Sequence, residues 1–301
     1  MPFVLVIIAA IMADAQAVEV QVRNINLHLQ SSVILEIRQL RGQMIPLRRN
    51  QPVTFDDATS FVTRIRSAEI GVDASTLTEL MNSYVFAYPG APLKNVEITI
   101  DHDRIRQKGT IHKGVDVPFE LEGSLDVTAD GRIRLHPDKV TSAHVPVKGL
   151  LHLFGKDISR LVNIKQDRGV RIEGDDILLD PSRMFPPPRI EGKVTSVRIE
   201  GAKIVQTFGS GPPASLELPL KAPSYIYHRG GVVRFGKLTM TDTDLEIVKE
   251  GSGDWLNFSF PEYNRQLVAG YSKNTPLHGL IVFMPDFQRL HPPESGDPRV
   301  F

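Results

Sequence analysis

Acidic side chains that could hold a cation gather in one short stretch of the chain. Asp175 and Asp176 follow a glycine, and Asp180 lies a few residues beyond them. Carboxylate oxygens are ligands that Ca²⁺ prefers, but the ion takes about six to eight oxygens, more than three carboxylates supply by themselves. The spacing also matches no known calcium-binding loop. We therefore interpret the stretch as a hairpin turn rather than a metal site.

Histidine, serine and cysteine give no catalytic pattern either. The nine histidines show neither HExxH nor HxH spacing, which favours separate surface or turn positions over a metal centre. Ser210 lies between two glycines, but no strand-to-helix pattern follows it, so it is no nucleophile elbow. The chain has no cysteine and hence no thiolate nucleophile or disulfide. We predict no catalytic residue, no metal and no cofactor, and we rank a hydrolase with an unrecognised site third among the possible functions.

The clearest structural signal among the elements is a strand from Val115 to Glu122. Apolar and polar residues alternate along it, so they point to opposite faces of a sheet. The same alternation comes before and after this strand, for example at Val96, Ile98 and Ile100. Short polar turns separate the alternating segments, which predicts a meander of antiparallel strands with one continuous apolar face.

Two helices accompany the meander. The first is predicted from Asp73 to Tyr88, with Ser75 as its cap and apolar residues recurring three and four positions apart. The second is predicted from Lys148 to Val162. Residues 181–188 end in three prolines and are predicted to form an exposed loop. Two helices are few for the apolar surface of so many strands, so part of that surface needs another cover.

The order of these elements resembles the tubular lipid-binding superfamily and its bacterial relatives, the LmeA-like phospholipid-binding proteins. The resemblance covers roughly Ser75 to Phe208. It rests on the element order and on two consecutive segments, Val117-Pro118-Phe119-Glu120-Leu121-Glu122-Gly123 followed by Asp130-Gly131-Arg132-Ile133-Arg134-Leu135. It implies an α+β, mostly β fold in which a long curved antiparallel sheet wraps amphipathic helices and encloses an apolar tunnel for acyl chains. Additional β segments would flank this core at both ends of the chain.

A lipid tunnel would be lined by apolar side chains of the helices and the meander. The resemblance implies that the lining consists of apolar residues on the helical stripes and on the apolar face of the strands: Leu80, Tyr84, Ile98, Val115, Val117, Phe119, Leu121, Leu125, Val127, Ile133, Leu135, Leu151 and Phe154. The expected partner is then a phospholipid or another acyl-chain ligand. The alternative is a structural or interaction protein of the cell envelope in which flanking segments fill the core.

An aromatic segment near the C-terminus offers a second candidate site. Trp255, Phe258, Phe260 and Tyr263 lie close together in the sequence. They would suit the portal of a tunnel or peripheral contact with a membrane interface, where tryptophan and tyrosine are favoured. They would equally suit a small satellite core, and the sequence leaves both interpretations open.

Composition and the N-terminal residues indicate the cellular compartment in which the protein is expected. The 301 residues include 35 Lys plus Arg and 35 Asp plus Glu, so no overall charge draws the chain to nucleic acid. An apolar run from Phe3 to Met12 precedes small residues that end at Ala17, which predicts a signal peptide, although no Lys or Arg precedes the run. The alternative is a buried first strand. We expect export to the periplasm or cell envelope.

These observations give four predicted segments. They are a signal peptide (1–17), an N-terminal β segment (18–70), a core domain with a helix and a lipid-binding β-meander (71–209), and a C-terminal β-rich extension packed on the core (210–301). The lipid head group and the oligomeric state are not predicted.

Overall fold

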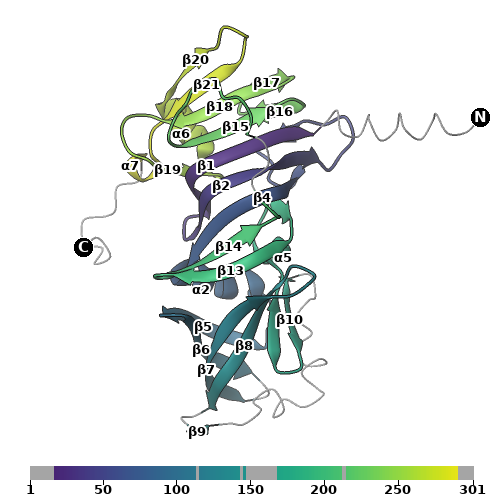
Figure 1. Cartoon of the computed structure of the whole chain (residues 1–301), viewed down its shortest axis with the longest axis vertical. Helices are drawn as coiled ribbons and strands as arrows, with labels where there is room; N and C mark the ends of the chain where they lie inside the picture. Colours follow the sequence, from purple (N-terminus) through teal and green to yellow (C-terminus); the bar gives the residue numbers. More distant parts are fainter. Residues whose placement is uncertain (1–16, 113–114, 143–144, 147–167, 212–214, 291–301) are drawn as a thin grey trace, which may run out of the picture. The chain divides into compact units, whose positions relative to one another are not determined.

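The computed structural model describes residues 17–112, 115–142, 145–146, 168–211 and 215–290. The chain divides into two compact units, formed by residues 1–68 with 211–301 and by residues 69–210. Strands account for 57% and helices for 11% of the described residues, and the antiparallel sheet is curled, which confirms the mostly β prediction (Figure 1). The predicted helix from Lys148 to Val162 and, except for Ala17, the predicted signal peptide lie outside the described residues.

The second unit is built on an antiparallel sheet with the strand order β10-β11-β8-β7-β6-β5, and β9 pairs with β8. The unit also contains the hairpin of β13 and β14 and the short strand β12, which are not part of this sheet but of the one that includes β4. The bounds are β5 (Leu93–Asp101), β6 (Arg104–His112), β7 (Asp116–Val127), β8 (Ile133–Ser142), β9 (Val145–Pro146), β10 (Val170–Glu173), β11 (Asp176–Leu179), β12 (Arg189–Glu191), β13 (Val194–Glu200) and β14 (Lys203–Phe208).

The meander from β5 to β8 forms where the polar turns predict it. The turn between β5 and β6 places His102 at a positive φ of 54°, and the turn between β7 and β8 places Gly131 at 87°. Glycine adopts this backbone conformation at little cost, which suits it to the second turn. A register shift next to Gly123 brings the backbone of His136 so close that a Cβ at position 123 would lie 2.3 Å from its carbonyl oxygen.

The predicted first helix is present as α2 (Ala74–Leu80) followed by the π-helical turn η1 (Met81–Val85). Its N-cap is Asp73 rather than Ser75, because the Asp73 carboxylate accepts a hydrogen bond of 2.7 Å from the backbone N–H of Thr76. Ser75 donates its hydroxyl to the same carboxylate over 2.8 Å. Aspartate and serine are both good N-caps, so the sequence alone did not decide between them.

This helix protects the edge strand β5 through two of its side chains. Asn82 donates to the carbonyl of Val96 over 2.6 Å and accepts from the amide of the same residue over 2.9 Å. One turn earlier, the Thr78 hydroxyl accepts from the amide of Ile98 over 2.9 Å. An unpaired strand edge is a template for aggregation, and these side chains occupy part of it.

The proline-rich segment is not the exposed loop that its composition predicts. Residues Pro181–Met184 form the short helix α5, with Pro181 and Met184 buried. Pro186 and Pro188 are buried as well. The helix begins because the Asp180 carboxylate accepts from the backbone N–H of Ser182 and because a proline suits the first helical position.

The first unit is made from both ends of the chain. In its sheet the strands run in the order β4-β2-β1-β15-β18-β21-β20, β19 pairs with β1, and β17-β16-β3 form a small separate sheet. The bounds are β1 (Val18–Gln30), β2 (Val33–Pro46), β3 (Val53–Thr54), β4 (Phe61–Asp73), β15 (Tyr225–Arg229), β16 (Val232–Phe235), β17 (Leu238–Thr241), β18 (Asp244–Lys249), β19 (Leu256–Ser259), β20 (Tyr271–Asn274) and β21 (Leu280–Met284), with helices α6 (Tyr263–Ala269) and α7 (Phe287–Leu290). The last residues of β4 belong to the second unit.

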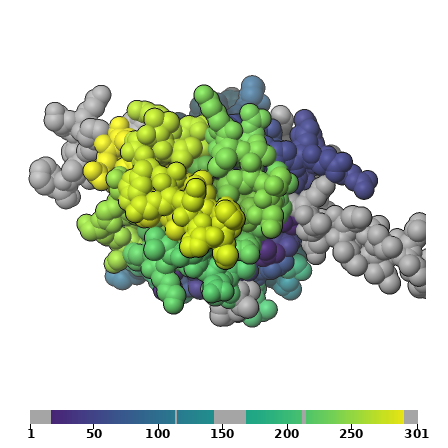
Figure 2. Space-filling model, turned by 90° about the horizontal axis from the view of Figure 1, so that it is seen from above, coloured from purple at the N-terminus to yellow at the C-terminus, as the bar shows by residue number. Residues whose placement is uncertain are grey.

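Long-range pairing holds this first unit together. Strand β1 pairs antiparallel with β15 over five residue pairs, from Glu19 with Arg229 to Arg23 with Tyr225. Gln21 of β1 also donates to the Tyr225 hydroxyl over 2.6 Å, a contact between buried side chains. The C-terminal part of the chain, yellow in Figure 2, supplies much of the surface seen in that view. The N-terminal and C-terminal β segments thus share one sheet.

Candidate functional site

The apolar face of the second-unit sheet follows the predicted alternation. Leu125 lies directly opposite Leu135, and Val127 lies opposite Ile133, on adjacent antiparallel strands. Residues that face each other across such strands point to the same side of the sheet, so these four side chains share one face. Ile133 and Leu135 are buried, whereas Leu125 and Val127 are half-buried.

On this face, burial decreases from Leu121 back toward the start of β7. The exposed fraction is 5% at Leu121 and 6% at Phe119; Val117 is half-buried and Val115 is 68% exposed. Gly109 lies opposite Phe119 on β6, and a Cβ there would come within 2.9 Å of the phenyl ring. The sheet therefore packs closely at Phe119 and Leu121 and becomes open toward the start of the strand.

The predicted tunnel lining falls into four groups. Leu80, Ile98, Phe119, Leu121, Ile133 and Leu135 are buried, and Tyr84, Val117, Leu125 and Val127 are half-buried. Val115 does not line an enclosed space, because it precedes β7, whose last pair with β6 joins His112 and Asp116. Leu151 and Phe154 lie outside the described residues.

The opposite face of the sheet carries charged pairs between neighbouring strands. Arg134 contacts Asp126 through two nitrogens, at 2.9 and 2.7 Å, and Arg106 contacts Glu122 at 3.2 Å. A hydrogen bond to Asp176 raises the pKa of His136 above its usual value. Such exposed pairs contribute little to stability, so this face is a solvated one.

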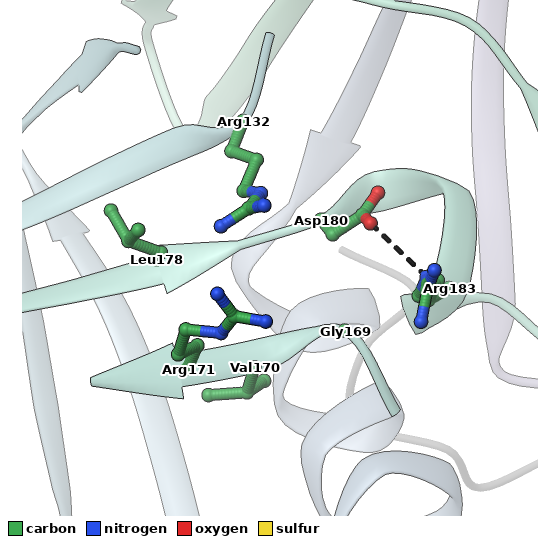
Figure 3. A pocket seen from close by; sticks show the side chains of 7 residues that line it. All are labelled: Arg132, Gly169, Val170, Arg171, Leu178, Asp180 and Arg183. Atoms are coloured by element: carbon green, nitrogen blue, oxygen red, sulfur yellow. Dashed lines mark ion pairs between the residues drawn. The ribbon is translucent and has the colours of Figure 1, made fainter. Parts of the chain in front are cut away.

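An arginine pocket, which we define by Arg132, Arg171, Arg183, Asp180, Leu178, Val170 and Gly169, lies at one end of the same sheet. Its volume is about 80 Å³. Figure 3 shows the guanidinium ends of Arg132 and Arg171 directed toward one another, with Arg183 on the turn of α5. Arg132 immediately precedes β8, Arg171 lies on β10 and Arg183 lies on α5.

Each arginine of the pocket has an acidic neighbour. Arg183 lies 3.4 Å from Asp180, the only carboxylate in the pocket lining. Outside the lining, Glu173 lies 3.3 Å from Arg171 and 3.8 Å from Arg132, and Asp130 lies 3.1 Å from Arg132. The lining itself thus carries three guanidinium groups against one carboxylate.

Comparison of the chain with protein-family models, with curated proteins and with solved structures found no match. The site is therefore interpreted from its own geometry. Within the described residues, no group of three or more His, Cys, Asp or Glu side chains is arranged to hold a metal ion. In the same part of the chain, no helix is long and apolar enough to cross a membrane.

The acidic stretch at the end of this sheet is a turn, as the sequence predicts. Gly174 adopts a positive φ of 61° between β10 and β11, and Asp175 is exposed beside it. Asp176 pairs with His136, and Asp180 caps α5. Each carboxylate after the turn thus has a structural partner.

The aromatic segment lies in the core of the first unit and not at its surface. Phe258 and Tyr263 are each 1% exposed, and Phe260 is 8% exposed. Phe55 stacks against Phe260 at 5.5 Å between ring centroids and meets Tyr263 edge-on at the same distance. The satellite-core interpretation fits this packing, because buried rings cannot touch a membrane. Trp255 alone is half-buried.

Sequence reasoning missed the arginine pocket. Arg132, Arg171 and Arg183 are far apart in the chain and form no motif. Only the pairing of β11 with both β8 and β10 brings their strands together. A surplus of arginine over lysine around these strands was the one available signal, and alone it indicates no site.

Proposed function

We propose that the protein binds the acyl chains of a lipid on the apolar face of the β5–β8 sheet. The observation that carries the proposal is the decline of burial along β7. Apolar residues of one face pass from buried at Leu121 and Phe119 to half-buried at Val117, near the start of the strand. Apolar surface gains roughly 25 cal/mol per Å² when it leaves water, so an acyl chain laid along the open part would be held without charged contacts.

The resemblance to LmeA-like phospholipid-binding proteins supports the same proposal. The order of α2 followed by a four-strand antiparallel meander agrees with the element order on which that resemblance rests. We extend the proposal to a carrier or sensor of lipid in the cell envelope, because the first seventeen residues have the composition of a signal peptide.

The proposal is tested with one large side chain placed on either face of β7. Val117→Trp should occupy the space of an acyl chain and lower the amount of lipid that copurifies, whereas Glu120→Trp, on the charged face, should leave it unchanged. Lipid is measured by solvent extraction and mass spectrometry, and the melting temperature is recorded for both variants. The expected result for the parent protein is lipid in about equimolar amount.

Two results would contradict the proposal. One is a parent protein that carries no lipid, together with a Val117→Trp variant destabilised by about 1 to 3 kcal/mol, the cost of overpacking a filled core. The protein would then be the structural or interaction protein of the envelope. The other is equal loss of lipid in both variants, which would place the lipid elsewhere.

A further inference from the structure

The arginine pocket concentrates positive charge at a hollow that the acyl-chain proposal does not use. The guanidinium groups of Arg132 and Arg171 are directed toward one another, and Arg183, which is ion-paired with Asp180, also lines the pocket (Figure 3). The side chains of Arg171 and Arg183 are 52% and 54% exposed, so a ligand from solvent has access. Like charges repel, and a cluster of this kind is stabilised when an anion occupies it.

The carboxylates near the pocket leave donors free for such an anion. Asp180 is already engaged, because one of its oxygens accepts from Ser182 and the other faces Arg183. A single oxygen of Glu173 serves both Arg171 and Arg132. Arg132 also pairs with Asp130, at 3.1 Å through its other terminal nitrogen. A guanidinium group has five N–H donors, so both arginines keep donors beyond these ion pairs.

The small size of the pocket and its arginines together favour a small oxyanion. A volume of about 80 Å³ suits a tetrahedral oxyanion. Sites for larger ligands are roughly 300 to 1,000 Å³. Arginine matches the geometry of phosphate oxygens with two parallel hydrogen bonds, which makes it the residue of choice for phosphate recognition. Leu178 and Val170, both buried, also line the pocket.

We propose that the arginine pocket binds a phosphoryl group through Arg132 and Arg171, with Arg183 closing the third side. The group belongs either to a free phosphorylated ligand or to the head group of a phospholipid. Glu173 competes with it for the same two arginines. The inference does not depend on an acyl chain held by the β7 face, so either proposal can fail alone.

The test measures binding of inorganic phosphate by calorimetry and of vesicles by flotation. The vesicles are phosphatidylcholine with or without phosphatidic acid. Arg171→Gln should weaken binding about tenfold or more, because a charge-assisted contact is lost. Glu173→Gln should tighten binding, because the competing carboxylate is gone. Arg134→Gln is the matched control: it also lies on the charged face, is paired with Asp126, and does not line the pocket.

The two binding measurements distinguish a free phosphorylated ligand from a phospholipid head group. Saturable binding of phosphate without vesicle binding supports a free ligand. Binding to phosphatidic acid vesicles that inorganic phosphate displaces supports a lipid head group. The proposal is overturned if the parent binds neither, if Arg134→Gln weakens binding as much as Arg171→Gln, or if Glu173→Gln weakens it. Copurifying lipid, measured separately, reports on the acyl-chain proposal.

Discussion

Glu246 is a carboxyl group that the first unit removes from water completely. Its exposed fraction is 0%, one oxygen accepts a 2.7 Å hydrogen bond from the backbone N–H of Leu220, and the other has no hydrogen-bond partner among the described residues. Burial raises the pKa of Glu246 to about 7. The folded state therefore holds a proton that the unfolded chain has lost between about pH 4.5 and pH 7. Stability falls as pH rises through this range.

The variant Glu246→Gln tests the role of that proton. Glu246→Gln removes the ionisation while keeping an acceptor for Leu220, so the free energy of unfolding should rise by about 1 to 3 kcal/mol above pH 7 and change little near pH 4.5. Urea denaturation at both pH values measures the difference. A gain of equal size at both values would show that the charge of Glu246 is not the cause.

His228, in the same unit, has a pKa that is shifted in the opposite direction, downward. It is 1% exposed, its ring meets Phe55 edge-on at 5.4 Å, and burial lowers its pKa to about 4. The unfolded chain takes up a proton at this histidine as pH falls below about 6.5, whereas the folded state takes it up only near pH 4. Acid therefore destabilises the first unit through His228 and base through Glu246.

Among the elements, the helix formed by α2 and η1 has a role that its apolar stripe does not reveal. The stripe buries Leu77 and Leu80, whereas the polar residues Thr78 and Asn82 bond the backbone of β5. The helix thus covers part of an edge strand as well as apolar surface. The backbone amide and carbonyl of Val96 both take their hydrogen bonds from the side chain of Asn82.

Asn82→Ala should lower the free energy of unfolding by about 1 to 3 kcal/mol, because it leaves both backbone groups of Val96 without their partner. Hydrogen exchange at the Val96 amide should accelerate at the same time. The neighbouring variant Ser83→Ala is the control, since Ser83 is exposed and its hydroxyl donates to Glu79, one turn earlier. Equal losses in both variants would indicate a helix-propensity effect instead.

The sequence predicts local elements of this protein better than it predicts their partners. Alternation identified the meander and the two faces of β7, because side-chain direction depends only on neighbours in the chain. The aromatic segment was not assigned to core or surface, since its contact Phe55 is about two hundred residues away in the chain. The arginine pocket was missed for the same reason.

At the scale of the molecule, the division of the chain determines which parts are self-sufficient. Residues 69–210 are contiguous and contain a complete antiparallel sheet with its covering helix. The other unit is divided, and its strand β1 needs both β15 and β19 from the far end of the chain. Closing so long a loop costs entropy that only native pairing repays.

Fragments should reflect this difference. A fragment of residues 61–210, which keeps β4 whole, should fold and unfold in one cooperative transition, because the pairs of β5 to β8 lie within it. Residues 18–68 alone should give no dispersed spectrum, since β1 has lost two of its three neighbours. Circular dichroism and amide NMR spectra measure both. A folded 18–68 fragment would refute the dependence of β1 on the C-terminal strands.

The arrangement of the first unit also fixes an order of events on the ribosome. Strand β1 is the first described strand to be translated, yet β15 begins only at Tyr225, after every residue of the second unit has emerged. During that interval β1 has β2 as a hairpin neighbour and an open edge on its other side. Because open strand edges invite pairing with other chains, a nascent chain stalled before Tyr225 is the form of this protein most exposed to misassembly.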